Sequence, residues 1–117
     1  MAVDPALLKL ILERVVQSVG TDAACRADSI TCEGKSLTEI IQHCLLLIDA
    51  DAIEAGDLKK LNTTPFHFVT MVRLKPNGEA LLSELSQNAK LNKFKQHILQ
   101  LGGSLTSQLL VKYIVGS

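Results

Sequence analysis

The side chains most suited to chemistry are three histidines and three cysteines, and their spacing limits what they could do. They are His43, His67 and His97, with Cys25, Cys32 and Cys44. Only His43 and Cys44 are adjacent, and neighbouring residues on a helix point about 100° apart. No pair has the short spacing typical of zinc ligands, and no nucleophile, base and orienting group can be assembled. The sequence therefore predicts no catalytic residue, no enzyme, no metal site and no cofactor.

Gln42 and His43 are expected on the outward side of a helix that begins at Ser36. Either could contact a base edge, and Gln42 suits adenine. Alternatively, His43 packs over the hairpin that follows and hydrogen-bonds a backbone carbonyl, which is the interpretation we favour. Glu39 and Asp49 lie on the same side and would repel phosphate, and no Arg or Lys accompanies them. This helix is therefore poorly suited to the ordinary reading of DNA.

Positive charge is concentrated in the second half of the chain. Residues 1–57 contain four basic and ten acidic residues, a net charge of −6, and residues 58–117 contain eight basic and two acidic residues, a net charge of +6. The zero net charge of the whole chain removes the usual electrostatic argument for nucleic-acid or membrane binding. The uneven distribution still allows a basic half that touches phosphates, or acidic and basic halves that pair between two copies.

The basic side chains fall into groups that could each make contacts. Lys90 and Lys93 are spaced to share one helix face with His97, near a helix N-terminus, where cations oppose the macrodipole. An unfavourable local charge points to a partner, and a merely solvated face is the alternative. The candidate contact residues for nucleic acid or a partner are Gln42, His43, Lys59, Lys60, Arg73, Lys75, Lys90 and Lys93.

Helix caps and hydrophobic spacing predict the elements that position these side chains. Asp4 and Pro5 begin a helix whose buried stripe is expected to reach Val16 and Val19. A capping box begins the next helix at Ser36, and its buried stripe is expected to include Leu37 but not Leu46. The expected order is a helix over 5–19, a short strand over 29–32, a helix over 36–51, strands over 53–61 and 66–74 around a turn at 62–65, and three further helices, the second closed by the glycines at 102–103.

These elements indicate an α+β fold in one domain. The 117 residues are 47% hydrophobic but only 3% aromatic, so aliphatic side chains must fill a single core. A helix that leads directly into a two-stranded hairpin is the centre of a winged helix, with the hairpin as its wing. We predict a winged-helix-like domain over 1–117, with the helix, strand, helix and wing in 1–74 and C-terminal helices in 75–117.

The N-terminal region and the cysteines indicate the compartment. The apolar stretch from Leu7 to Val19 is interrupted by charged residues and follows no basic segment, so neither a secretory signal nor a transmembrane span is expected. Three cysteines without a Cys-x-x-Cys spacing favour reduced thiols. We therefore expect a cytoplasmic protein with no membrane contact.

Three segments, in their order along the chain, resemble a known family. They are HCLLLIDADAIE at 43–54, RLKPNGEALL at 73–82, and KFK at 93–95 followed by LGGS at 101–104. In these segments the chain is similar to the bacterial and prophage domain of unknown function 2513, and in style to YjcQ-like winged-helix proteins. The resemblance implies a winged-helix fold and a bacterial or phage setting, and it supplies no catalytic residue. Asp51 stands where that family tends to have Gly, and Asp tolerates a left-handed turn better than most residues.

Two functions follow as hypotheses. The first is a small DNA-associated transcriptional regulator that touches duplex phosphates weakly and salt-dependently through the wing and the basic C-terminal half. The second is a protein-interaction module or homodimer without nucleic-acid binding, in which the acidic half of one copy meets the basic half of another. Its apolar surface would come from Leu105, Leu109, Tyr113 and Ile114.

Overall fold

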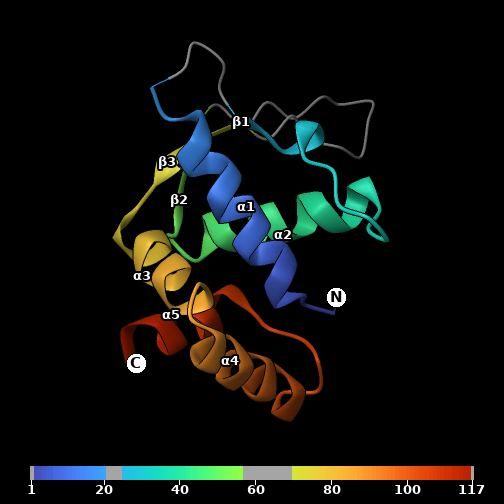
Figure 1. The fold of residues 1–117 in the computed structure, drawn as a ribbon, viewed down its shortest axis with the longest axis vertical. Helices are drawn as coiled ribbons and strands as arrows, with labels where there is room; N and C mark the ends of the chain where they lie inside the picture. Colours follow the sequence, from blue (N-terminus) through green and yellow to red (C-terminus); the bar gives the residue numbers. More distant parts are fainter. Residues whose placement is uncertain (1, 21–24, 57–69, 117) are drawn as a thin grey trace.

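A small antiparallel sheet lies at one edge of a group of helices in the computed structural model, which describes residues 2–20, 25–56 and 70–116 (Figure 1). The strands pair in the order β1-β3-β2, and both pairs are antiparallel. The predicted α+β class is confirmed. The elements are α1 (Pro5–Ser18), β1 (Cys25–Arg26), a short 3₁₀ helix η1 (Ala27–Ser29), α2 (Leu37–Asp49), β2 (Ile53–Ala55), β3 (Thr70–Leu74), α3 (Pro76–Leu85), α4 (Asn88–Gln100) and α5 (Ser107–Gly116).

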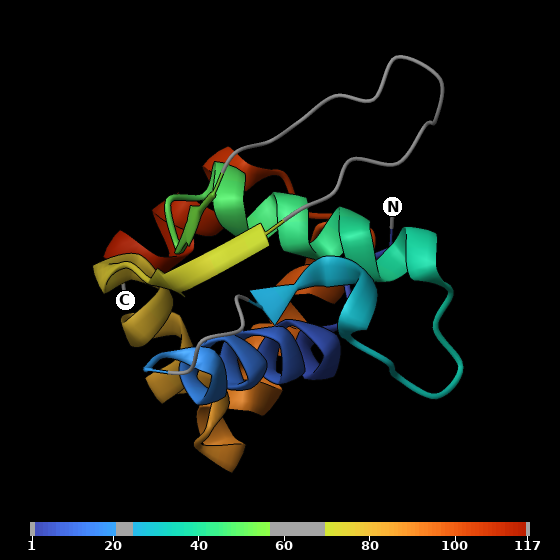
Figure 2. The same ribbon diagram turned by 90° about the horizontal axis from the view of Figure 1, so that it is seen from above.

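Helix α1 lies at the centre of the core. The Ala6 N–H donates to the Asp4 carboxylate at 2.9 Å, and Pro5 occupies the first turn, so the predicted cap is confirmed. The helix contacts β3, α2, α3 and α4 (Figure 1), and Figure 2 shows α1 and α2 on either side of β3. Its fully buried face consists of Leu7, Leu8, Ile11, Leu12 and Val15.

Two helix faces differ from the expected ones. Val16 and Val19 are 47% and 58% exposed, because the core covers the side of α1 that holds Val15, and Val16 is turned about 100° away from it. In α2, Leu37 is exposed and Leu46 is buried, so the buried face is rotated from the expected stripe. The spacing of apolar residues does not by itself determine which of two neighbouring apolar residues faces the core.

The strand predicted over 29–32 is wrong. Strand β1 lies at Cys25–Arg26 instead, where Cys25 pairs with Met71 of β3. The Ser29 hydroxyl donates to the Arg26 carbonyl at 2.6 Å and the Ile30 N–H to the Ala27 carbonyl at 3.3 Å, which closes η1. Local side-chain bonding of this kind competes with strand pairing.

The other predicted elements agree with the described residues. The Glu39 N–H donates to the Ser36 hydroxyl at 3.2 Å, which confirms the capping box of α2. β2 pairs with β3, while the predicted strand over 58–61, the turn at 62–65 and residues 66–69 lie outside the described residues, as do Lys59 and Lys60. Gly102 and Gly103 close α4 with positive φ values of 79° and 86°.

A close junction between two turns holds α3 against the sheet. The Lys75 N–H donates to the Ala52 carbonyl at 2.9 Å, and the Asn77 side-chain amide donates to the Ala50 carbonyl at 3.3 Å. Asp51 adopts the left-handed conformation expected of it, with a φ of 61°. A Cβ atom on buried Gly78 would overlap the Ala52 carbonyl oxygen, so only glycine fits in this turn of α3.

Replacing Gly78 with Ala should therefore lower the free energy of unfolding by about 1–3 kcal/mol, because the methyl group must push α3 away from the Ala52 backbone. Chemical denaturation followed by circular dichroism measures this. Gly116→Ala is the matched control, since a Cβ atom there would meet nothing within 4 Å. Equal stability of the two variants would contradict the tight packing of this junction.

Candidate functional site

His43, the first candidate, is fully buried in α2 and does not lie on an outward surface. The Asp4 N–H donates to its Nε2 at 3.0 Å, and its Nδ1 lies 2.7 Å from the Glu39 carbonyl oxygen. An amide N–H can only donate and a carbonyl can only accept, so Nδ1 carries the proton and Nε2 is bare. The expected bond to a backbone carbonyl is therefore present, but the ring packs under the N-terminal segment and not over the hairpin.

The N-terminal segment is what covers His43. Lys35 lies 3.3 Å from the Asp4 carboxylate and 3.7 Å from that of Glu39, and the Val3 N–H donates to the Gly103 carbonyl at 2.9 Å. These contacts hold residues 3–4 between α2 and the turn after α4. His43 therefore connects two parts of the fold and is not available to a nucleic acid.

Burial lowers the pKa of His43 below the ordinary value of 6.5, and the hydrogen bond to Glu39 opposes this shift. The charges that face the ring come from Asp4, Lys35 and Glu39. A proton on Nε2 would also face the Asp4 N–H and remove that bond. The folded state therefore favours the neutral ring.

Gln42 is exposed, but its own helix offers no cation. Thr38 and Asp49 are also exposed on α2, and none of the helix's residues is Lys or Arg. Phosphate contacts depend mainly on those two side chains. The described geometry gives Gln42 no charged neighbour that would attract a nucleic-acid backbone.

Arg73 and Lys75 are paired with acidic side chains of the same chain. Arg73 lies opposite Glu54 in the sheet, with Nε 2.6 Å from the carboxylate, and the Lys75 ammonium lies 2.7 Å from the Asp51 carboxylate. The pairs are at the surface, so each contributes little to stability. They do reduce the positive charge that these two candidates could offer a partner.

The lysines of α4 and α5 have no such partners. Lys90 and Lys93 are exposed, as are two lysines that the spacing argument left out, Lys95 and Lys112. None of the four has an ion-pair partner among the described residues. No Asp or Glu occurs after Glu84, a signal readable in the sequence that would have identified all four. We call these four lysines the basic face, as a name for the set and not for one side of α4, since Lys93 and Lys95 point about 160° apart around that helix.

Aromatic contacts fix α5 against α4 behind the basic face. Fully buried Phe94 meets Tyr113 edge to face at 4.9 Å, and the His97 ring lies 5.0 Å from Tyr113 at an angle of 32°. Burial raises the pKa of Tyr113, and the charge and hydrogen bond of Glu84 raise it further. Between the helices is a hollow of about 310 Å³, lined by Lys93, His97, Leu109, Lys112, Tyr113 and Gly116.

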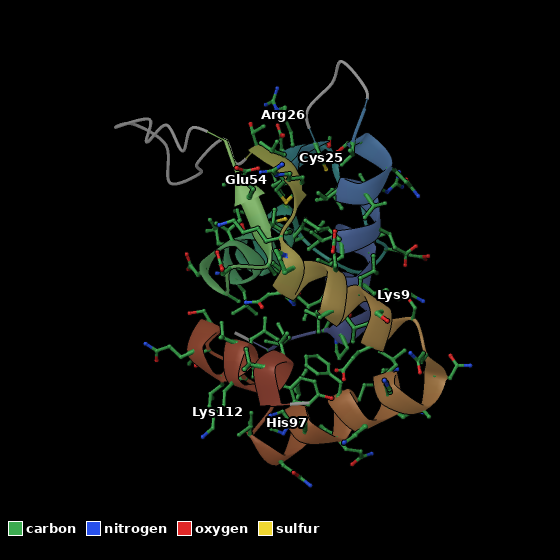
Figure 3. The ribbon with its side chains drawn as sticks, turned by 90° about the vertical axis from the view of Figure 1, so that its left-hand side faces the viewer. Lys9, Cys25, Arg26, Glu54, His97 and Lys112 are labelled. Atoms are coloured by element: carbon green, nitrogen blue, oxygen red, sulfur yellow. The ribbon has the colours of Figure 1, made fainter. Side chains whose placement is uncertain are left out.

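The hairpin and the basic face lie at opposite ends of the molecule. Figure 3 shows Glu54 near one end and His97 with Lys112 near the other. Arg73 belongs to the first end, because it pairs with Glu54. The structure therefore brings Lys93 together with Lys112 at one hollow, and Lys112 lies at the other end of the molecule from Arg73.

The cysteines show no reactive arrangement. Burial raises the pKa of the Cys25 thiol, and burial with the nearby Cys25 raises that of Cys44 to about 12. Such thiols stay protonated at neutral pH and are poor nucleophiles. In residues 2–20, 25–56 and 70–116, no three His, Cys, Asp or Glu side chains gather around a possible metal position, and no helix has the length and apolar character needed to cross a membrane.

Comparison with known proteins adds no relative. No family model matches the chain, and no curated protein or solved structure is detectably similar to it. The resemblance in residues 43–54, 73–82 and 93–104 therefore stays a prediction.

Stability should depend on pH through His43. Because the folded state lowers this pKa, the contribution of the neutral ring is complete above about pH 6.5 and is lost as the pH falls through the lowered value. The melting temperature should therefore decrease from pH 7.5 to pH 5. His43→Gln should cost about 1–3 kcal/mol at pH 7.5, because the buried ring that bonds both the Asp4 N–H and the Glu39 carbonyl is lost, and should flatten the pH dependence.

His97→Gln is the control for this measurement, since it removes a half-buried histidine from another helix and leaves His43 in place. It should keep the wild-type decrease. If His43→Gln showed that same decrease, the neutral, buried His43 would not be its source.

Proposed function

We propose that this protein is a small winged-helix-like regulator that associates weakly with the phosphate backbone of duplex DNA through its basic face. The proposal assigns a binding role and no catalytic step. It keeps the basic C-terminal half of the sequence hypothesis but leaves out Arg73 and Lys75, which are already paired, while Lys59 and Lys60 of the predicted wing lie outside the described residues. The bacterial or phage setting and the cytoplasmic location remain expectations from the sequence.

The charge pattern is the observation that carries the proposal. Arg73 and Lys75 are paired within the chain, whereas the four lysines of the basic face are unpaired among the described residues and have no acid beside them in sequence. Each lysine that touches a phosphate releases condensed counterions, which supplies affinity without sequence readout. α2 carries acidic side chains and no Lys or Arg, so binding of this kind would have little base specificity.

The order of the elements supports the winged-helix-like part of the proposal. β1 follows α1, α2 leads directly into β2, and the sheet order β1-β3-β2 is the one expected when a first strand joins a two-stranded wing. Only η1 stands between β1 and α2, in place of the first helix of a helix-turn-helix pair. α2 has the position of the DNA-reading helix but lacks the first helix of such a pair. This agrees with DNA contact through another surface.

A second candidate function, protein interaction, is favoured by one surface feature. Exposed Val16 and Val19 line a hollow of about 650 Å³ with Leu74 and Leu82. Exposed apolar side chains that adjoin in this way are typical of interaction surfaces. Of the four residues expected to form an apolar interface, Leu105 and Ile114 are buried in the chain's own core, whereas Leu109 is exposed and Tyr113 is half-buried.

The test is fluorescence anisotropy of a labelled random-sequence duplex titrated with the whole protein at several salt concentrations. Four phosphate contacts predict that log K falls with log salt with a slope of about −3 to −4. Changing all four lysines of the basic face to Gln should abolish binding at low salt. Changing one of them should reduce the slope by about 0.9.

The matched control is the double variant Arg73→Gln and Lys75→Gln, which removes cations that are already paired. It should bind like the wild type, with thermal melting used to confirm that every variant is folded. Loss of binding in this control, or its survival in the fourfold variant, would contradict the basic face as the contact surface.

A further inference from the structure

The hollow between α4 and α5 combines cationic and apolar walls over a fixed floor. Lys93 and His97 are four residues apart on α4, so they lie on one side of that helix, and Lys112 approaches from α5 (Figure 3). Leu109 and Tyr113 supply the apolar part of the wall. No carboxylate lines the hollow itself, and both helices contribute a lysine to it, while the nearby Glu84 carboxylate is hydrogen-bonded to Tyr113.

The Tyr113 ring at the base of the hollow is held in place by its neighbours. Tyr113 is held edge to face by Phe94, which is fully buried, and its other ring neighbour is His97. A ring held by two aromatic neighbours from α4 is already positioned for a ligand, so binding does not have to order it. The described volume of about 310 Å³ is at the lower end of ligand pockets and fits one small molecule.

We infer that this hollow binds a small organic phosphate monoester, with the phosphate between Lys93 and Lys112 and the organic group against Leu109 and Tyr113. The phosphate of a monoester has three acceptor oxygens and a charge of about −1.5 to −2 at pH 7, which suits two ammonium groups and an imidazole. A carboxylate has one negative charge and only two oxygens to offer them. The apolar wall distinguishes an organic ester from free phosphate.

This inference does not depend on DNA binding, because it needs only the side chains of the hollow. A protein that binds no duplex could still bind the monoester. A ligand seated between Lys93 and Lys112 would, however, occupy two of the four lysines of the basic face and would compete with a nucleic acid. The hollow would then be a regulatory site for the proposed function.

The experiment is an NMR titration of the isotope-labelled full chain with phenyl phosphate at low salt. Saturable shifts should appear at the residues that line the hollow. Inorganic phosphate, phenol and benzoate are the comparison probes, and each should bind at least about fivefold more weakly because each lacks one of the matched parts. Lys93→Gln and Lys112→Gln should each weaken phenyl phosphate binding about tenfold, as expected for a lost charge-assisted hydrogen bond.

Lys95→Gln is the matched control, since Lys95 is exposed on the same helix and does not line the hollow. It should change the affinity by less than about twofold, which reflects only the loss of a nearby charge. The inference is overturned if phenyl phosphate gives no saturable shifts in the hollow, if inorganic phosphate binds as well, or if Lys95→Gln weakens binding as much as Lys93→Gln.

Discussion

Burial of one face of α1 is the constraint on which the arrangement depends. A fully buried aliphatic side chain stabilises the folded state by about 1.5–3 kcal/mol relative to exposure, and this helix buries five of them. Helix α2 is the other element with a large buried apolar face, made of Ile40, Ile41, Cys44, Leu46 and Leu47. The sheet and α2 therefore pack along α1 while α3 and α4 close around it, which directs α4 and α5 to the end opposite the hairpin (Figure 1).

The lysines of the basic face have no ion-pair partner among the described residues because they lie far from the acidic side chains of the first half. The sheet and the turn after α2 bring Glu54 and Asp51 to Arg73 and Lys75, so basic residues near the hairpin are countered within the chain. The lysines of α4 and α5 are beyond the reach of those acids, and their own helices contain none. Among the described residues, the basic side chains of the second half thus divide into a paired set, Arg73 and Lys75, and the unpaired lysines of the basic face.

Caps, turns and helix positions could be predicted from the sequence because their causes are local. The Asp4 and Ser36 caps, the left-handed Asp51 and the closing Gly102 each depend on a few adjacent residues. The burial of His43 could not be predicted, because it depends on a distant part of the chain. Residues 3–4, at the start of α1, cover the ring, and the Asp4 N–H donates to it. The ion pair between Arg73 and Glu54 depends in the same way on strand register, so the sequence alone could not show that this candidate residue is already paired within the chain.

The central claim is that nucleic acid contacts the α4–α5 end and leaves the α2 and hairpin surfaces free. Chemical-shift mapping of the isotope-labelled chain with a short unlabelled duplex at low salt tests it most directly, because every backbone amide reports separately. The account predicts shifts concentrated at residues 88–100 and 107–116, with little change in α2 or β2. Shifts concentrated around Gln42 and along the hairpin would contradict it and restore the ordinary reading mode of a winged helix.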